Sequence, residues 1–200
     1  EERIDEAIRV AKESELAILV LGGNEATCRE GWWFNHLGDR DDLSLLGRQE
    51  ELFQKVFETG IPVIVVLING RPLIIKSMKE KASAILECWY LGQETGLAIA
   101  DIIFGNINPS GKLPITFPAS VGQIPAYYYQ KPSAKRGFLF SSVEPLYPFG
   151  YGLSYTTYEY RNIRLKKSCI KVGEETEAVI DLTNTGDRPG DEVVQFYIHD

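Results

Sequence analysis

The first half of the chain alternates amphipathic helical patterns with continuous apolar runs. Over residues 2–13, apolar side chains recur at the spacing of one helix face, which predicts an amphipathic helix. The apolar run at 16–21 is ended by two glycines, which is typical of a strand in a parallel sheet covered on both faces. We therefore expect a helix followed by a fully buried strand.

The same two patterns repeat further along the chain. Gly60 and Gly105 follow helical patterns and suit the ends of helices, whereas Pro72 suits a first helical turn. We expect helices at 47–60, 71–81 and 93–105, and strands at 63–68 and 83–90. This alternation predicts an α/β fold built on a doubly wound, mainly parallel sheet.

The pattern changes after residue 105. Residues 106–154 are rich in proline, glycine and tyrosine and have no helical period, which predicts a long ordered segment that wraps over a domain or lines a site. Beyond it, apolar and polar residues alternate, and we expect strands at 156–167, 175–186 and 191–200. Short strands separated by polar turns are typical of an immunoglobulin- or fibronectin-like sandwich.

These patterns divide the chain into three parts. We expect an α/β sandwich domain at 1–118, a linker rich in proline, tyrosine and glycine at 119–154, and the start of an all-β domain at 155–200. The chain begins within a helical pattern and ends within a strand pattern, so we interpret it as a fragment of a longer protein.

Composition narrows the function classes. The chain has 200 residues and a net charge of −7, which argues against nucleic acids and anionic membranes as partners. Its three cysteines form no CxxC pair, so neither a disulfide framework nor a zinc site is expected. No run of 18 apolar residues predicts a transmembrane helix, and no phosphate-loop, nucleophile-elbow or HExxH motif occurs. We expect a soluble protein without cofactor or metal, and neutral ligands such as sugars remain open.

The strongest candidate site is the loop after the first strand, residues 22–42. Ligands of open parallel sheets bind outside the carboxyl ends of the strands, and this loop is far longer than a usual connection. It carries Glu25, Glu30, Trp32 and Trp33. Tryptophan rings stack on sugar faces, and carboxyl groups bind hydroxyls or donate a proton to a glycosidic oxygen.

The same residues also suit structural roles that involve no substrate. A loop carboxylate such as Glu30 is usually solvated, and Glu25 is equally suited to capping a helix or pairing with an arginine. Trp32 and Trp33 suit either sugar stacking or anchoring of the loop, and we expect one of them in each role.

Three charged residues near this loop are interpreted as structural. Asp39 and Arg40 lie close enough in sequence to brace the returning loop, because a buried arginine needs a carboxylate partner. Arg71 follows Asn69 and Gly70 in a tight turn after the second strand.

Four segments carry a resemblance to a known family. They are LVLGGNEATCREGWWFNHLGDRDDLSLLGRQEEL, VIVVLINGRPL, AILECWYLGQETGLAIADIIFGNINPSGKLPITFP and PLYPFGYGLSYTTYEY. They resemble the second domain of glycoside hydrolase family 3 and its junction with a fibronectin type III-like domain. The family includes β-glucosidases, β-xylosidases and enzymes that act on N-acetylglucosaminides.

The resemblance implies that two domains each supply one of the two catalytic carboxyl groups. In the family, a barrel domain carries the nucleophilic aspartate, and the α/β sandwich presents the general acid/base glutamate on a loop over the barrel. Matched to that pattern, Glu30 is the general acid/base and Glu25 is the alternative. The barrel lies outside this chain.

The function implied is that of a retaining, exo-acting β-glycosidase that hydrolyses terminal β-D-glucosyl or β-D-xylosyl residues. Its substrate would be an oligosaccharide or an aryl β-glycoside, it needs no cofactor, and a homodimer is compatible with it. The alternative is a non-catalytic carbohydrate-binding or scaffold domain with the same fold. A flavodoxin-like nucleotide-binding module is disfavoured because no phosphate loop is present.

Overall fold

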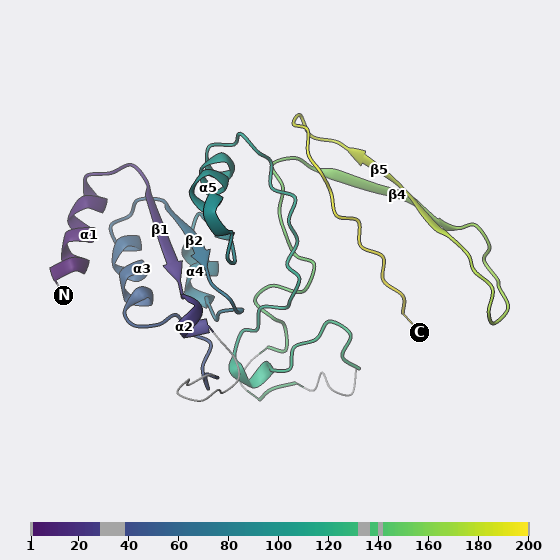
Figure 1. The fold of residues 1–200 in the computed structure, drawn as a ribbon, viewed down its shortest axis with the longest axis horizontal. Coiled ribbons are helices and arrows are strands. Elements are labelled where there is room, and N and C mark those ends of the chain that lie inside the picture. Colours follow the sequence, from purple (N-terminus) through teal and green to yellow (C-terminus); the bar gives the residue numbers. More distant parts are fainter. Residues whose placement is uncertain (1, 29–38, 132–136, 140–141, 200) are drawn as a thin grey trace. The chain divides into compact units, whose positions relative to one another are not determined.

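The computed structural model describes residues 2–28, 39–131, 137–139 and 142–199 (Figure 1). The chain divides into two compact units. One consists of Glu1–Ile99 and Leu113–Gly150, and the other of Ala100–Lys112 and Tyr151–Asp200. The predicted domain limits at residues 118 and 155 stay a prediction.

The first unit contains a three-stranded parallel sheet. Its strands are β1 (Ala17–Gly22), β2 (Val63–Ile68) and β3 (Ala84–Glu87), in the order β1-β2-β3. Ala17 pairs with Val63, and Ile64 pairs with Ala84, so the three carboxyl ends reach the same edge. The parallel sheet predicted from the apolar runs is confirmed.

Helices precede, connect and follow these strands. They are α1 (Glu2–Lys12), α2 (Glu25–Cys28), α3 (Gln49–Phe57), α4 (Lys76–Lys81) and α5 (Thr95–Ile103), with a short 3-10 turn, η1 (Gly92–Glu94), before α5 (Figure 1). The predicted start of a helix at residue 71 is wrong. Leu73 and Ile75 are buried in the core at a spacing of two, and the Ile74 N–H donates to Leu43 O at 2.9 Å, so this stretch is extended and Pro72 opens no helix.

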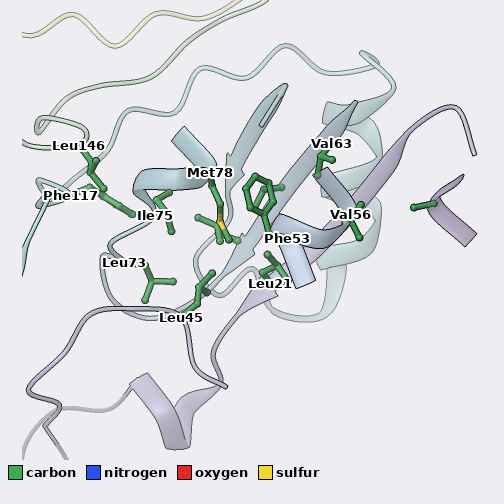
Figure 2. Close-up of a cluster of buried hydrophobic side chains, with 13 residues drawn as sticks. Leu21, Leu45, Phe53, Val56, Val63, Leu73, Ile75, Met78, Phe117 and Leu146 are labelled. Carbon is green, nitrogen blue, oxygen red and sulfur yellow. The ribbon is translucent and has the colours of Figure 1, made fainter. Parts of the chain in front are cut away.

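The core of the first unit lies on one face of the sheet. Phe53 of α3, Met78 of α4 and Val65 of β2 are completely buried in it (Figure 2 draws the cluster around Phe53 and Met78). On the other face of β1, Ile18 is 44% and Val20 is 60% exposed. The expectation that β1 is covered on both faces is therefore wrong within the described chain, although Val66 of β2, which pairs with Val20, is completely buried on that face.

The segment that crosses back after α5 contributes to the same core. Within the first unit it forms the 3-10 turn η2 (Val121–Gln123) and an isolated antiparallel bridge between Phe117 and Tyr147. The Phe117 ring is buried and lies 5.8 Å from the Trp89 ring. Lys79 Nζ donates to Leu146 O at 2.5 Å and thereby ties the segment to α4.

The second unit contains an antiparallel pair of strands, β4 (Tyr158–Leu165) and β5 (Ala178–Asn184). The pairing shifts register between Arg161 and Arg164, where Asn162 has a φ of 53°. The strand predicted at 191–200 is wrong, since residues 191–199 form no strand. A period-two pattern shows which side chains would share a face, but a strand also needs a hydrogen-bonded partner.

None of the helices in the described part of the chain is long and apolar enough to cross a membrane.

We expect Phe53→Ala to lower the free energy of unfolding by about 3–5 kcal/mol, because the ring is fully buried and its removal leaves a cavity. Phe57→Ala is the matched control: it lies one turn away, its ring stacks on Phe53 at 6.3 Å, and it is only partly buried. Urea unfolding followed by fluorescence measures both. If both variants lose the same free energy of unfolding, the placement of Phe53 at the centre of the core is contradicted.

Candidate functional site at the carboxyl edge of the sheet

The ends of the three strands bring together segments that are far apart in sequence. Gly22 and Gly23 follow β1, Asn69 to Arg71 follow β2, and Trp89 and Tyr90 follow β3. The edge predicted to hold a ligand site is thus formed by one short helix and two tight turns.

Gln49 fixes the chain where β1 ends. Its Oε1 accepts a hydrogen bond from Gly22 N–H at 2.7 Å, and its Nε2 donates to Gly22 O at 2.9 Å and to Leu46 O at 3.1 Å. Gly22 has a φ of 133°, and a Cβ there would lie 2.0 Å from Ile68 O. Only glycine fits this close approach, so the direction in which the chain leaves β1 is determined.

The short helix α2 begins directly after these glycines. Asn24 Oδ1 accepts from Thr27 N–H at 3.1 Å, and Asn24 N–H donates to Thr27 Oγ1 at 3.0 Å, which is a reciprocal cap. Glu25 lies exposed in the first turn, where a negative charge suits the helix dipole. Its charge also raises the pKa of Tyr90, after the larger effects of desolvation and of Cys28. Glu25 is thus near enough to the end of β3 for its charge to act on Tyr90.

The last residue of α2 is held by the turn after β2. The buried Arg71 Nε donates to Cys28 O at 3.3 Å, and Asn69 Nδ2 donates to Arg71 O at 2.7 Å. At Gly70 a Cβ would lie 2.8 Å from the Tyr90 ring and 3.2 Å from Cys28 Cβ. The turn is thus packed between α2 and the end of β3.

Cys28 lies at the centre of these contacts. Burial opposes ionisation of its thiol, but hydrogen bonding by Tyr90, by Gly70 N–H and by Thr27, together with the charge of Arg71, lowers its pKa below the ordinary value. The thiol is buried, so these contacts anchor α2.

Glu87 is a residue that the sequence analysis missed. It ends β3, and its Oε1 accepts from Trp89 N–H at 3.1 Å. Burial raises the pKa of Glu87 to about 7, against smaller lowering effects of Trp89 N–H and the Asn69 side chain. The only signal in the sequence was a lone carboxyl in the apolar run that ends β3.

Trp89 has an unusual backbone conformation for a bulky residue. Its φ is 50°, in the left-handed region that disfavours such side chains. The hydrogen bond to Glu87 and the contact of its ring with Phe117 hold it there.

Several predicted site residues fall outside the part that the structure describes. Glu30, Trp32 and Trp33 lie within the undescribed segment 29–38. Their roles stay predictions. Glu25 lies in the first turn of α2, and Arg71 contacts Cys28, the last residue of the same helix.

Asp39 and Arg40, which are predicted to brace the returning loop, lie just after the undescribed segment, and their bracing role stays a prediction. Asp39 is exposed and has a φ of 40°. Arg40 Nη2 lies 3.4 Å from Asp42 Oδ2 and donates to Ser44 O at 3.1 Å. Hydrogen bonds from Ser44, and to a smaller extent the charge of Arg40, lower the pKa of Asp42. The carboxylate that pairs with Arg40 in the structure is thus that of Asp42, which the sequence analysis did not single out.

Within the described residues, no group of three or more His, Cys, Asp or Glu side chains is arranged to hold a metal ion. The edge offers a hydrogen-bonded base from which the segment after Cys28 departs, beside the buried Glu87 oxygen and the Trp89–Phe117 ring pair.

Comparisons with known proteins agree with this architecture. Residues 1–155 match the model of the glycosyl hydrolase family 3 C-terminal domain. The chain is 47% identical to a β-xylosidase of Formosa agariphila, over all of this chain and 27% of that protein. It is 40% identical to a periplasmic β-glucosidase of Salmonella typhimurium, over 98% of this chain and 26% of that protein.

Solved structures give the same result. A β-glucosidase from Erythrobacter marinus superposes with a TM-score of 0.90 at 44% identity, over 94% of this chain and 25% of that one. A β-glucosidase from Listeria innocua, determined in complex with glucose, superposes with a TM-score of 0.80 at 34% identity, over 94% of this chain and 27% of that one. The chain spans about a quarter of the length of these relatives.

We expect Gln49→Ala to lower the free energy of unfolding by about 1–3 kcal/mol, because it leaves the backbone groups of Gly22 without side-chain partners. Gln54→Ala, in the same helix, is the control, since its amide bonds only other side chains. Chemical denaturation measures both variants. A Gln49→Ala protein as stable as Gln54→Ala would show that the hydrogen bonds between Gln49 and Gly22 contribute nothing to stability.

Proposed function

The chain belongs to glycosyl hydrolase family 3, and from this we propose that it forms part of a retaining, exo-acting β-glycosidase. The substrates proposed are oligosaccharides or aryl β-glycosides with a terminal β-D-glucosyl or β-D-xylosyl residue. The names of the relatives, β-xylosidase and β-glucosidase, support both sugars.

We assign the general acid/base role to Glu30. The observation that carries this assignment is the tie between Arg71 and Cys28, which fixes the start of the loop at the carboxyl edge, two residues before Glu30. Ligands of open parallel sheets bind at this edge. A carboxyl group presented from such a fixed base suits proton transfer to a glycoside held by a neighbouring domain.

The proposed mechanism uses a second carboxylate from a barrel domain. Glu30 donates its proton to the glycosidic oxygen while the aspartate of the barrel attacks the anomeric carbon, and the C–O bond to the leaving group breaks. Glu30, now ionised, takes a proton from water as that water attacks the glycosyl–enzyme intermediate. The sugar leaves with its β configuration, and both carboxyl groups return to their starting states.

Glu25 stays the alternative for the acid/base role. It is exposed in the first turn of α2, and its charge acts on Tyr90 at the same edge. Trp32 and Trp33 are proposed to bind the sugar face or to anchor the loop.

Residues 155–200 are proposed to form the start of a fibronectin type III-like domain. The antiparallel pair of β4 and β5 supports this, because such sandwiches are built from antiparallel strands. A non-catalytic carbohydrate-binding or scaffold domain remains the alternative function, and the experiment below separates the two.

We expect Glu30→Ala in the full-length protein to slow hydrolysis of aryl β-glycosides with poor leaving groups by about 10²–10⁴-fold, because they need a proton in the transition state. Azide should restore turnover of substrates with good leaving groups and give the β-glycosyl azide. Steady-state kinetics and product analysis measure both effects.

Glu25→Ala is the control. If it loses activity and gains azide rescue while Glu30→Ala does neither, the acid/base is Glu25. Full-length protein that binds sugars but hydrolyses none of these glycosides would favour the binding function.

A further inference from the structure

Two buried acceptor atoms at the carboxyl edge lack a hydrogen-bond donor among the residues that the structure describes. They are Asn69 Oδ1 and Glu87 Oε2. Glu87 is only partly buried as a residue, but this oxygen is inaccessible. A buried acceptor without a donor is costly, so a pair of them at one place calls for an explanation.

The two side chains are neighbours. Leu67 pairs with Glu87 across β2 and β3, and Asn69 lies two residues beyond Leu67, on the same face of the sheet. The Asn69 side chain is close enough to lower the pKa of Glu87, against the larger effect of burial, which raises it. The orientation of the Asn69 amide follows from its hydrogen bond to Arg71. Asn69 Nδ2 donates to Arg71 O at 2.7 Å, and only the amide nitrogen can donate.

One proton would satisfy both atoms. Glu87 Oε1 already accepts from Trp89 N–H, which leaves Oε2 as the site for a hydrogen. We propose that Glu87 is a positioning residue, held protonated in the folded protein, whose Oε2–H donates to Asn69 Oδ1. The effect of burial on the pKa of this group, which rises to about 7, acts in the same direction.

The proposed bond begins a chain of contacts that leads to the catalytic loop. Asn69 Nδ2 holds Arg71 O, and Arg71 Nε holds Cys28 O, at the start of the segment that contains Glu30. A protonated Glu87 keeps the Asn69 amide in the orientation that this chain requires. The consequence for catalysis rests on the proposed function, whereas the protonation state does not.

The groups that face Glu87 add no positive charge. From β2 they are the neutral Asn69 amide and the Arg71 backbone reached through it. From β3 they are Trp89 N–H and Cys88, and burial together with the charge of Glu87 raises the pKa of the Cys88 thiol to about 11. Among the described residues, the ionisation of Glu87 is thus governed by burial and by these hydrogen bonds.

The sign of the pH dependence follows from the raised pKa. The ordinary value is 4.5 and the folded value about 7, so the folded protein holds this proton more tightly than the unfolded chain. The stabilisation of the folded protein by the proton on Glu87 is fully present below pH 4.5, declines as the pH rises towards 7, and is absent above pH 7.

The test is Glu87→Gln in the full-length protein, because an amide keeps both a donor and an acceptor at every pH. From pH 4.5 to pH 8, the unfolding equilibrium constant of the wild type relative to Glu87→Gln should rise on the order of 100-fold. Glu94→Gln, which removes an exposed carboxyl after the same strand, should follow the wild type. If the unfolding equilibrium constants of the wild type and of Glu87→Gln change with pH in the same way, the proposal is overturned.

An infrared difference spectrum observes the proton directly. Wild type minus Glu87→Gln at pH 6 should show the C=O band of a protonated carboxyl, and its absence, as for an ionised Glu87 bridged by water, would overturn the proposal. These two measurements do not depend on glycosidase activity, so a failed Glu30 assignment leaves them intact.

Activity tests the positioning role. Glu87→Leu should lower kcat with little change in KM at pH 6, and Glu87→Gln should restore wild-type kcat at that pH, since only the amide supplies the donor. Wild-type kcat in Glu87→Leu would show that Glu87 does not position the loop.

Discussion

The turn from Asn69 to Arg71, whose two polar side chains are buried, is the contact on which the carboxyl edge depends. Arg71 is 5% exposed, and its guanidinium reaches the backbone of α2, while Gly70 admits no side chain between Tyr90 and Cys28. A buried arginine must be hydrogen-bonded to be tolerated. The hydrogen bond from Arg71 Nε to Cys28 O ties α2 to the turn after the middle strand.

The geometry at the end of β1 complements this turn. Gly22 approaches the backbone of β2 more closely than any other residue type allows, and Gln49 bonds both its N–H and its C=O. One contact thus fixes where the chain leaves the sheet, and the other fixes where the short helix ends. A loop with both constraints at its base can present a side chain to a neighbouring domain at little entropic cost.

The two carboxyl groups discussed here differ because their environments differ. Glu87 is enclosed beneath the strand ends, where burial favours its neutral form and its partners are backbone and amide groups. Glu30 belongs to a long loop rich in charged and aromatic residues, which is where a group that must exchange protons with substrate is expected. The same residue type thus serves as a structural donor in one place and as a proposed proton carrier in the other.

The sequence by itself determined the three strands of the parallel sheet and the edge at which a site should lie, because apolar runs and glycine stops are local signals. It also carried the family motifs and the candidate loop. Only the tertiary structure decided that α4 begins at Lys76, that β1 is open on one face, and that residues 191–199 form no strand. It alone brought Gln49 to Gly22 and Asn69 to Glu87, since contacts between residues distant in sequence depend on strand order and packing, which no local pattern encodes.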